Sequence, residues 1–87
     1  MSDRVKFFMG SQLVGTFPSR SLPTLDGSYN YEPYRSPGHA NLHRELEAGK
    51  VPRCFYETAA QRVSFCVTAS PTKGVLTLAG VEVDDDL

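Results

Sequence analysis

Two histidines stand four residues apart near the middle of the chain, in the segment HANLH. Residues at i and i+4 project from the same side of an α-helix, so His39 and His43 would point together. Two imidazoles can bind a metal ion, and Glu47 continues the same row as a candidate third ligand. The segment lacks the glutamate of the HExxH zinc-protease motif. We therefore assign no metal and no cofactor. The alternative is that the histidines edge a packed helix, with hydrogen-bonded or hydrated tips.

The side chains most often found at binding hot spots cluster just before these histidines. They are Tyr29, Tyr31, Tyr34 and Arg35. Arg35 can hold a carboxylate or phosphate through two hydrogen bonds, and the free N–H groups of a following helix would favour the same anion. The alternative is that the tyrosines are half-buried strand residues and that Arg35 pairs with Glu32 or Glu57.

The charge balance counts against nucleic acid as a partner. Nine basic and ten acidic side chains give a net charge of -1, so no basic excess exists to neutralise phosphates. Stacking of bases on Tyr29 and Tyr31 is therefore disfavoured. No apolar run approaches the roughly 18 residues that span a membrane, and the N-terminal residues lack the layout of a signal peptide. We expect a cytoplasmic protein with no membrane contact.

Two cysteines, Cys54 and Cys66, are too few for a disulfide scaffold, and we expect free thiols. With a loop of about three residues between their strands, Phe55 would share the core face with Phe65, and the cysteines would lie opposite each other on the other face. Oxidation could then link them. An enzyme could use a thiol as nucleophile, a histidine as base and Arg35 as anion holder, but no spacing ties these groups together.

The sequence pattern predicts a β-hairpin over residues 4–17, with a two-residue turn at 10–11. Apolar side chains fall on both of its faces, so we expect either that both faces are covered or that one meets a second subunit. Residues 18–27 read as a loop that Leu22 and Leu25 hold to the core.

The middle of the chain holds the one convincing helix. Alternation predicts a strand over residues 28–32, and the helix follows over about 37–48. Ser36 is a typical N-cap, Pro37 suits the first helical position, and Gly49 suits the position after the C-cap.

The remaining residues predict a second hairpin, 51–58 with 62–69, and a last strand over 74–83. Apolar residues of the last strand change phase, which predicts a bulge at Ala79-Gly80.

These elements predict an α+β fold for a single domain over residues 1–87, with frayed ends at 1–3 and 84–87. We expect a small, curved, mostly antiparallel sheet or open barrel of about five to six strands in the order β-β-β-α-β-β-β, with the helix over one end.

The favoured function is a small, soluble, non-catalytic binding module that uses a surface around residues 29–43. The candidate binding residues are Tyr31, Tyr34, Arg35, His39 and His43. The expected partner is a protein or a small anionic ligand, and a homodimer would add stability that so short a chain can use. The alternative is a small metal- or cysteine-dependent enzyme with its site at a subunit interface.

Overall fold

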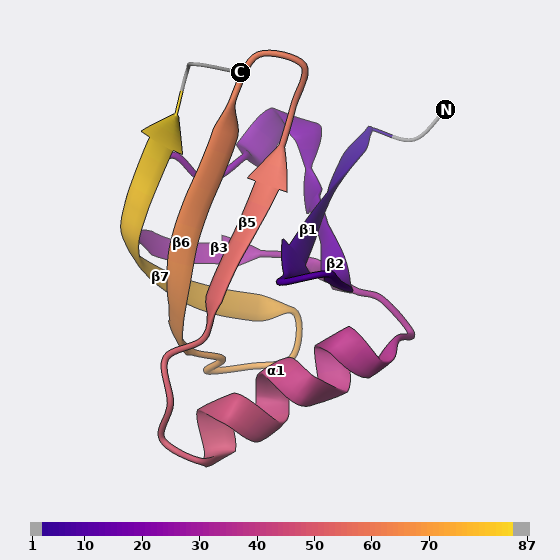
Figure 1. The fold of residues 1–87 in the computed structure, drawn as a ribbon, viewed down its shortest axis with the longest axis vertical. Helices are drawn as coiled ribbons and strands as arrows, with labels where there is room; N and C mark the ends of the chain where they lie inside the picture. The colour runs from indigo at the N-terminus through magenta and orange to yellow at the C-terminus, as the bar shows by residue number, and fades with distance from the viewer. Residues whose placement is uncertain (1–2, 85–87) are drawn as a thin grey trace.

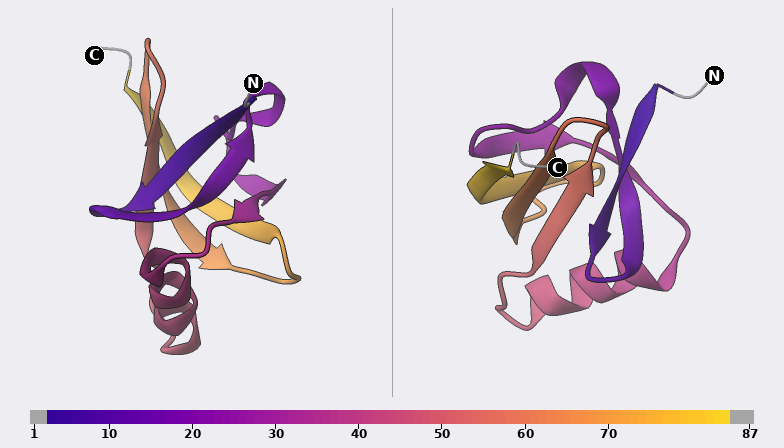
Figure 2. Two further views of the ribbon diagram at one scale, coloured as in Figure 1. Left: turned by 90° about the vertical axis from the view of Figure 1, so that its right-hand side faces the viewer. Right: turned by 45° about the horizontal axis from the view of Figure 1, so that its top comes forward.

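The computed structural model describes residues 3–84 and confirms the predicted α+β class (Figure 1). The elements in chain order are β1 (Arg4–Met9), β2 (Gln12–Pro18), the 3-10 turn η1 (Ser19–Ser21), β3 (Gly27–Asn30), β4 (Glu32–Pro33), α1 (Pro37–Glu47), β5 (Arg53–Glu57), β6 (Arg62–Ala69) and β7 (Val75–Asp84). All strand pairs are antiparallel, in the order β3-β7-β6-β5-β1-β2-β4. The helix lies beyond one end of the strands, as predicted (Figures 1 and 2).

One short segment nearly closes this sheet into a barrel. The strand predicted over residues 28–32 is divided into β3, which pairs with β7, and β4, which pairs with β2. The two ends of the sheet are therefore joined by consecutive residues of one chain segment. Tyr31 stands between the two strands, and its backbone N–H donates to the carbonyl of Gly74 over 2.9 Å. Because this residue is fixed from both sides, its side chain has a defined direction.

Aromatic rings fill the interior of the barrel. The rings of Phe7 and Phe17 stack with centroids 4.3 Å apart, and Phe65 packs against both. The buried apolar residues are Phe7, Val14, Phe17, Tyr31, Leu42, Cys54, Tyr56, Val63, Phe65, Val67, Leu76 and Leu78. Burial of such large side chains is the main source of stability in a domain of this size.

The N-terminal hairpin contains a β-bulge in β2. Phe8 pairs with Leu13, but Phe7 pairs with Gly15, so Val14 is the extra residue. The adjacent residues Val14 and Gly15 are both buried at this bulge, as is Phe7. The turn at residues 10–11 connects the strands as predicted.

The outer face of the hairpin is partly covered by the chain itself. Phe8 stacks on Phe55 with ring centroids 5.8 Å apart, and the Arg62 guanidinium lies 4.2 Å from the Phe55 ring centre. Phe55 therefore does not share the core face with Phe65, as it would with a three-residue loop between β5 and β6. Contact of this face with a second subunit stays a prediction.

The predicted cross-strand pairing of the cysteines is wrong. The loop between β5 and β6 has four residues, 58–61, so Cys54 pairs with Phe65 and Cys66 pairs with Arg53. Cys54 lies in the core, whereas Cys66 is half-buried on the outer face. A one-residue change of loop length exchanges the two faces of a strand, and this separates the thiols.

The predicted bulge in the last strand is confirmed. Ser64 pairs with Glu82 while Cys66 pairs with Ala79, so β7 uses one residue more than β6 over this interval. Gly80 has φ +61° at this point, a backbone conformation that other residues adopt only with strain.

The loop between β2 and β3 is held differently from the prediction. Leu22 packs against the core as expected, but Leu25 is 73% exposed, so its expected role is wrong. Pro23 is buried in its place, and its carbonyl accepts a 2.7 Å hydrogen bond from the Tyr56 hydroxyl.

The frayed ends predicted at 1–3 and 84–87 fall mainly outside the described residues, although residue 84 is the last residue of β7. Within residues 3–84, no helix has the length and apolar character needed to cross a membrane.

Candidate functional site

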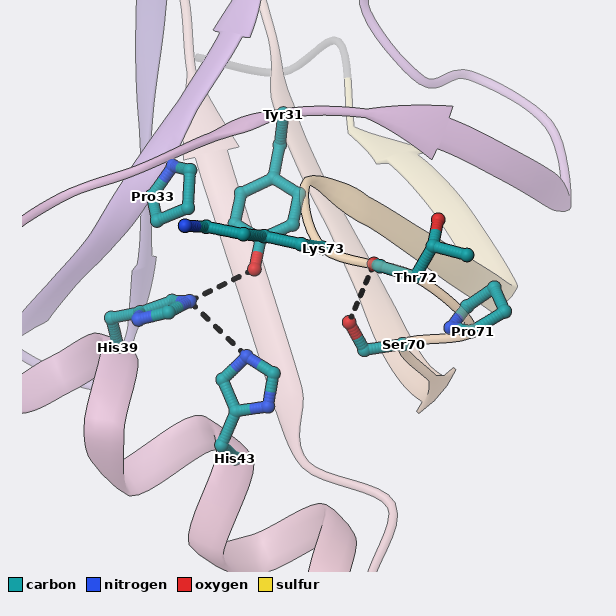
Figure 3. Close-up of a pocket in the computed structure, with 8 residues that line it drawn as sticks. All are labelled: Tyr31, Pro33, His39, His43, Ser70, Pro71, Thr72 and Lys73. Atoms are coloured by element: carbon teal, nitrogen blue, oxygen red, sulfur yellow. Dashed lines mark hydrogen bonds between the residues drawn. The ribbon is translucent and has the colours of Figure 1, made fainter.

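A cavity of about 410 Å³ lies between α1, the segment that closes the barrel and the turn from β6 to β7 (Figure 3). We call it the histidine pocket. It is lined by Tyr31, Pro33, His39, His43, Ser70, Pro71, Thr72 and Lys73. The segment over residues 31–43 and the distant turn over residues 70–73 therefore meet around one space.

The start of α1 is fixed against β2. The helix begins at Pro37 with Ser36 as N-cap, as predicted, but the Ser36 hydroxyl donates to the carbonyl of Leu13 and does not cap the helix. Gly38 is buried against the same carbonyl, which a Cβ atom would overlap. Asn41 donates to the side chain of Gln12 over 2.9 Å. These contacts hold the first turn of the helix, and with it His39, over the pocket.

A chain of three polar atoms crosses the pocket. Nε2 of His39 lies 2.9 Å from the Tyr31 hydroxyl oxygen and 3.2 Å from Nε2 of His43. Figure 3 shows both imidazoles projecting from the helix toward that hydroxyl. A nitrogen of a neutral imidazole has one hydrogen or one lone pair, so Nε2 of His39 can satisfy only one neighbour fully. The other neighbour keeps hydrogen-bonding capacity for a ligand.

Burial sets the protonation states of two members of this chain. It raises the pKa of Tyr31, while a hydrogen bond with the Ser70 side chain acts in the opposite direction. Burial lowers the pKa of His39, and the charge on His43 lowers it further. At neutral pH the Tyr31 phenol therefore keeps its proton and the His39 imidazole is neutral.

The pocket has a cation and no anion. Lys73 lines it, and no aspartate or glutamate is among the lining residues. Among the described residues, Lys73 forms no ion pair with an aspartate or glutamate. Lys73 is therefore a positively charged side chain that a negatively charged group in the pocket could contact.

The structure brings three of the five predicted binding residues together: Tyr31, His39 and His43. The residues that the sequence did not indicate come from the turn over 70–73. No local pattern marks that turn as functional, because its place beside the helix depends on pairing of β7 with β3.

The other two predicted residues lie elsewhere. Tyr34 is 46% exposed and lines a neighbouring cavity of about 220 Å³, while Arg35 is exposed and lines neither cavity. Glu32, an expected partner of Arg35, lies 3.4 Å from Nε of Arg4.

Neither Glu47, the candidate third metal ligand, nor the two cysteines of the enzyme hypothesis form a site with the histidines. Across residues 3–84, no group of three or more histidine, cysteine, aspartate or glutamate side chains is placed to hold a metal ion, and Glu47 is exposed. Burial, followed by the charge of Cys66, raises the pKa of Cys54 to about 12. A thiol with that pKa is not a thiolate at neutral pH, so Cys54 is not an activated nucleophile.

No protein-family model, no curated protein and no solved structure matches the chain.

Proposed function

We propose that this protein is a small non-catalytic binding module that holds a compact anionic molecule in the histidine pocket. The observation that carries the proposal is the set of hydrogen-bond donors around a cavity without a carboxylate. Lys73 supplies a positive charge, and Nε2 of His39 is shared between the Tyr31 hydroxyl and Nε2 of His43, so one of these two groups can also bond to a ligand. An oxygen of a carboxylate or phosphate would accept from both.

The walls of the pocket indicate the rest of the ligand. Pro33, Pro71 and the ring of Tyr31 present apolar surface. A volume of about 410 Å³ lies within the range of about 300–1,000 Å³ that is usual for small-molecule sites. The best fit is an anion attached to a small planar or apolar group, since donors hold one end and the prolines contact the other.

The serine and threonine side chains of the pocket are not placed to act as nucleophiles. A serine or threonine nucleophile would need a base within hydrogen-bond reach. The Ser70 hydroxyl instead donates to the backbone carbonyl of Val75 over 3.0 Å. The one other Ser or Thr side chain of the pocket, Thr72, is exposed, and no hydrogen bond joins either hydroxyl to His39 or His43 in the described part of the chain.

Calorimetry with phenyl phosphate tests this proposal. We expect saturable binding, and we expect Lys73→Gln to weaken it about fivefold, since a hydrogen bond from a solvent-accessible charge contributes about 1 kcal/mol. Lys50→Gln is the matched control, because it removes an equal charge that pairs with Glu45 at the other end of the helix. Equal affinity of the Lys73→Gln and Lys50→Gln variants would refute this placement of the ligand.

A further inference from the structure

The spacing of the three polar atoms in the histidine pocket fits a metal ion. Nε2 of His39 is 3.2 Å from Nε2 of His43 and 2.9 Å from the Tyr31 hydroxyl oxygen. With metal–ligand bonds of about 2.05 Å, ligand atoms at these separations subtend angles of about 100° and about 90° at the metal. Such angles are ordinary for four- to six-coordinate sites.

The hydrogen-bonding capacity of His39 Nε2 also favours a metal ion at this place. Its Nε2 has one lone pair or one hydrogen but two polar neighbours, so hydrogen bonding alone leaves one contact poorly satisfied. A divalent metal ion accepts one lone pair from each of the three atoms and displaces the phenol proton of Tyr31 to solvent, which removes this competition. All three atoms then bind the same ion, and His39 Nε2 no longer has to bond to two neighbours.

We propose that His39 and His43 bind a divalent transition-metal ion of the zinc, nickel or copper type, with the Tyr31 oxygen as third ligand and the remaining positions open to the pocket. Imidazole nitrogen is a preferred ligand of these ions. The i, i+4 spacing on α1 lets one rigid element supply both nitrogens. The contacts of the helix start with β2 hold His39 near Tyr31 before any metal arrives.

This site does not depend on the anion proposed above, because it stands on three atoms of the chain. The two ideas meet at the open coordination positions, where an anionic oxygen could bind. They can be tested separately: zinc is titrated without added anion, and phenyl phosphate is titrated in the presence of a chelator.

Zinc titration of chelator-treated protein, followed by the ring ¹⁵N resonances of the histidines, is the test. A Cys66→Ser background removes the partly exposed thiol as a competing ligand. We expect one equivalent of zinc to shift the Nε2 resonance of both histidines. His39→Gln and His43→Gln should each lower zinc affinity at least about tenfold, since even loss of a supporting partner typically costs 10- to 100-fold.

Two further variants define the third ligand. Tyr31→Phe keeps the buried ring and should weaken zinc binding, whereas Glu47→Gln is the matched control on the exposed end of the helix and should leave it unchanged. Amide spectra in chelator show whether each variant is folded. Binding unaffected by His43→Gln, or no binding by folded wild-type protein, would overturn the metal site; weakening by Glu47→Gln and not by Tyr31→Phe would overturn the role of Tyr31.

Discussion

The attachment of α1 to the barrel rests on a glycine, and replacing it gives a prediction whose sign is informative. Gly38 is buried, and a Cβ atom built on it would overlap the backbone carbonyl of Leu13 and touch the side chain of Gln12. Gly38→Ala therefore requires the helix start to move away from β2. Because His39 is the next residue, the same movement would disturb its contact with Tyr31.

Two opposing effects determine how much Gly38→Ala changes the free energy of unfolding. Gly38 has no positive φ, so helix propensity alone predicts that alanine stabilises the protein by up to about 1 kcal/mol. Overpacking in a buried site costs about 1–3 kcal/mol, and a backbone obstacle places the cost in the upper part of that range. We expect net destabilisation of about 1–2 kcal/mol, with a fall of about 4–8 °C in Tm for each kcal/mol.

Urea denaturation followed by circular dichroism measures this difference. Ala40→Gly at an exposed position of the same helix is the control, since it reports propensity without a clash. A Gly38→Ala variant as stable as wild type, or more stable, would refute the close approach of α1 to β2. The ring ¹⁵N resonance of His39 should change in Gly38→Ala and not in Ala40→Gly.

Four other predictions concern Gly80, the two cysteines and Arg35. Gly80→Ala places a side chain at φ +61° and should lower the free energy of unfolding by about 1–2 kcal/mol in urea titrations; a neutral result would contradict the bulge. A thiol reagent at pH 8 should modify Cys66 rapidly and Cys54 only on unfolding, and two fast thiols would contradict the register of β5. Because burial raises the pKa of the Cys54 thiol from 9.0 to about 12, the folded state keeps a proton that the unfolded chain loses; stability should therefore decline as the pH rises from about 9 towards 12, as alkaline denaturation would show. Arg35→Ala should leave phenyl phosphate affinity unchanged in calorimetry, and a clear loss would place the ligand outside the histidine pocket.

Local signals were sufficient for the parts of the fold that depend on neighbouring residues. Ser36, Pro37 and Gly49 mark the two ends of α1, and the helix begins and ends within a residue of the predicted bounds. The phase change before Gly80 similarly located the bulge, because side chains in a strand alternate between faces.

Local signals could not predict the pairing of strands or the contacts between segments that are far apart in the sequence. The faces of Cys54 and Phe55 depend on whether a loop has three or four residues, and the local sequence did not decide this. Tyr34 and Arg35 are close to Tyr31 in sequence but lie outside its pocket. Lys73 enters the pocket because the turn between β6 and β7 meets the segment that closes the barrel.

The most direct test of ligand binding in the histidine pocket is a ¹H–¹⁵N titration of the protein with phenyl phosphate in the presence of a chelator. The structure predicts saturable shifts at Tyr31, His39, His43 and the turn over residues 70–73, with Lys50 and the outer face of β5 unaffected. Shifts centred on Tyr34 and Arg35, or no saturable shift at millimolar ligand, would contradict the proposed site.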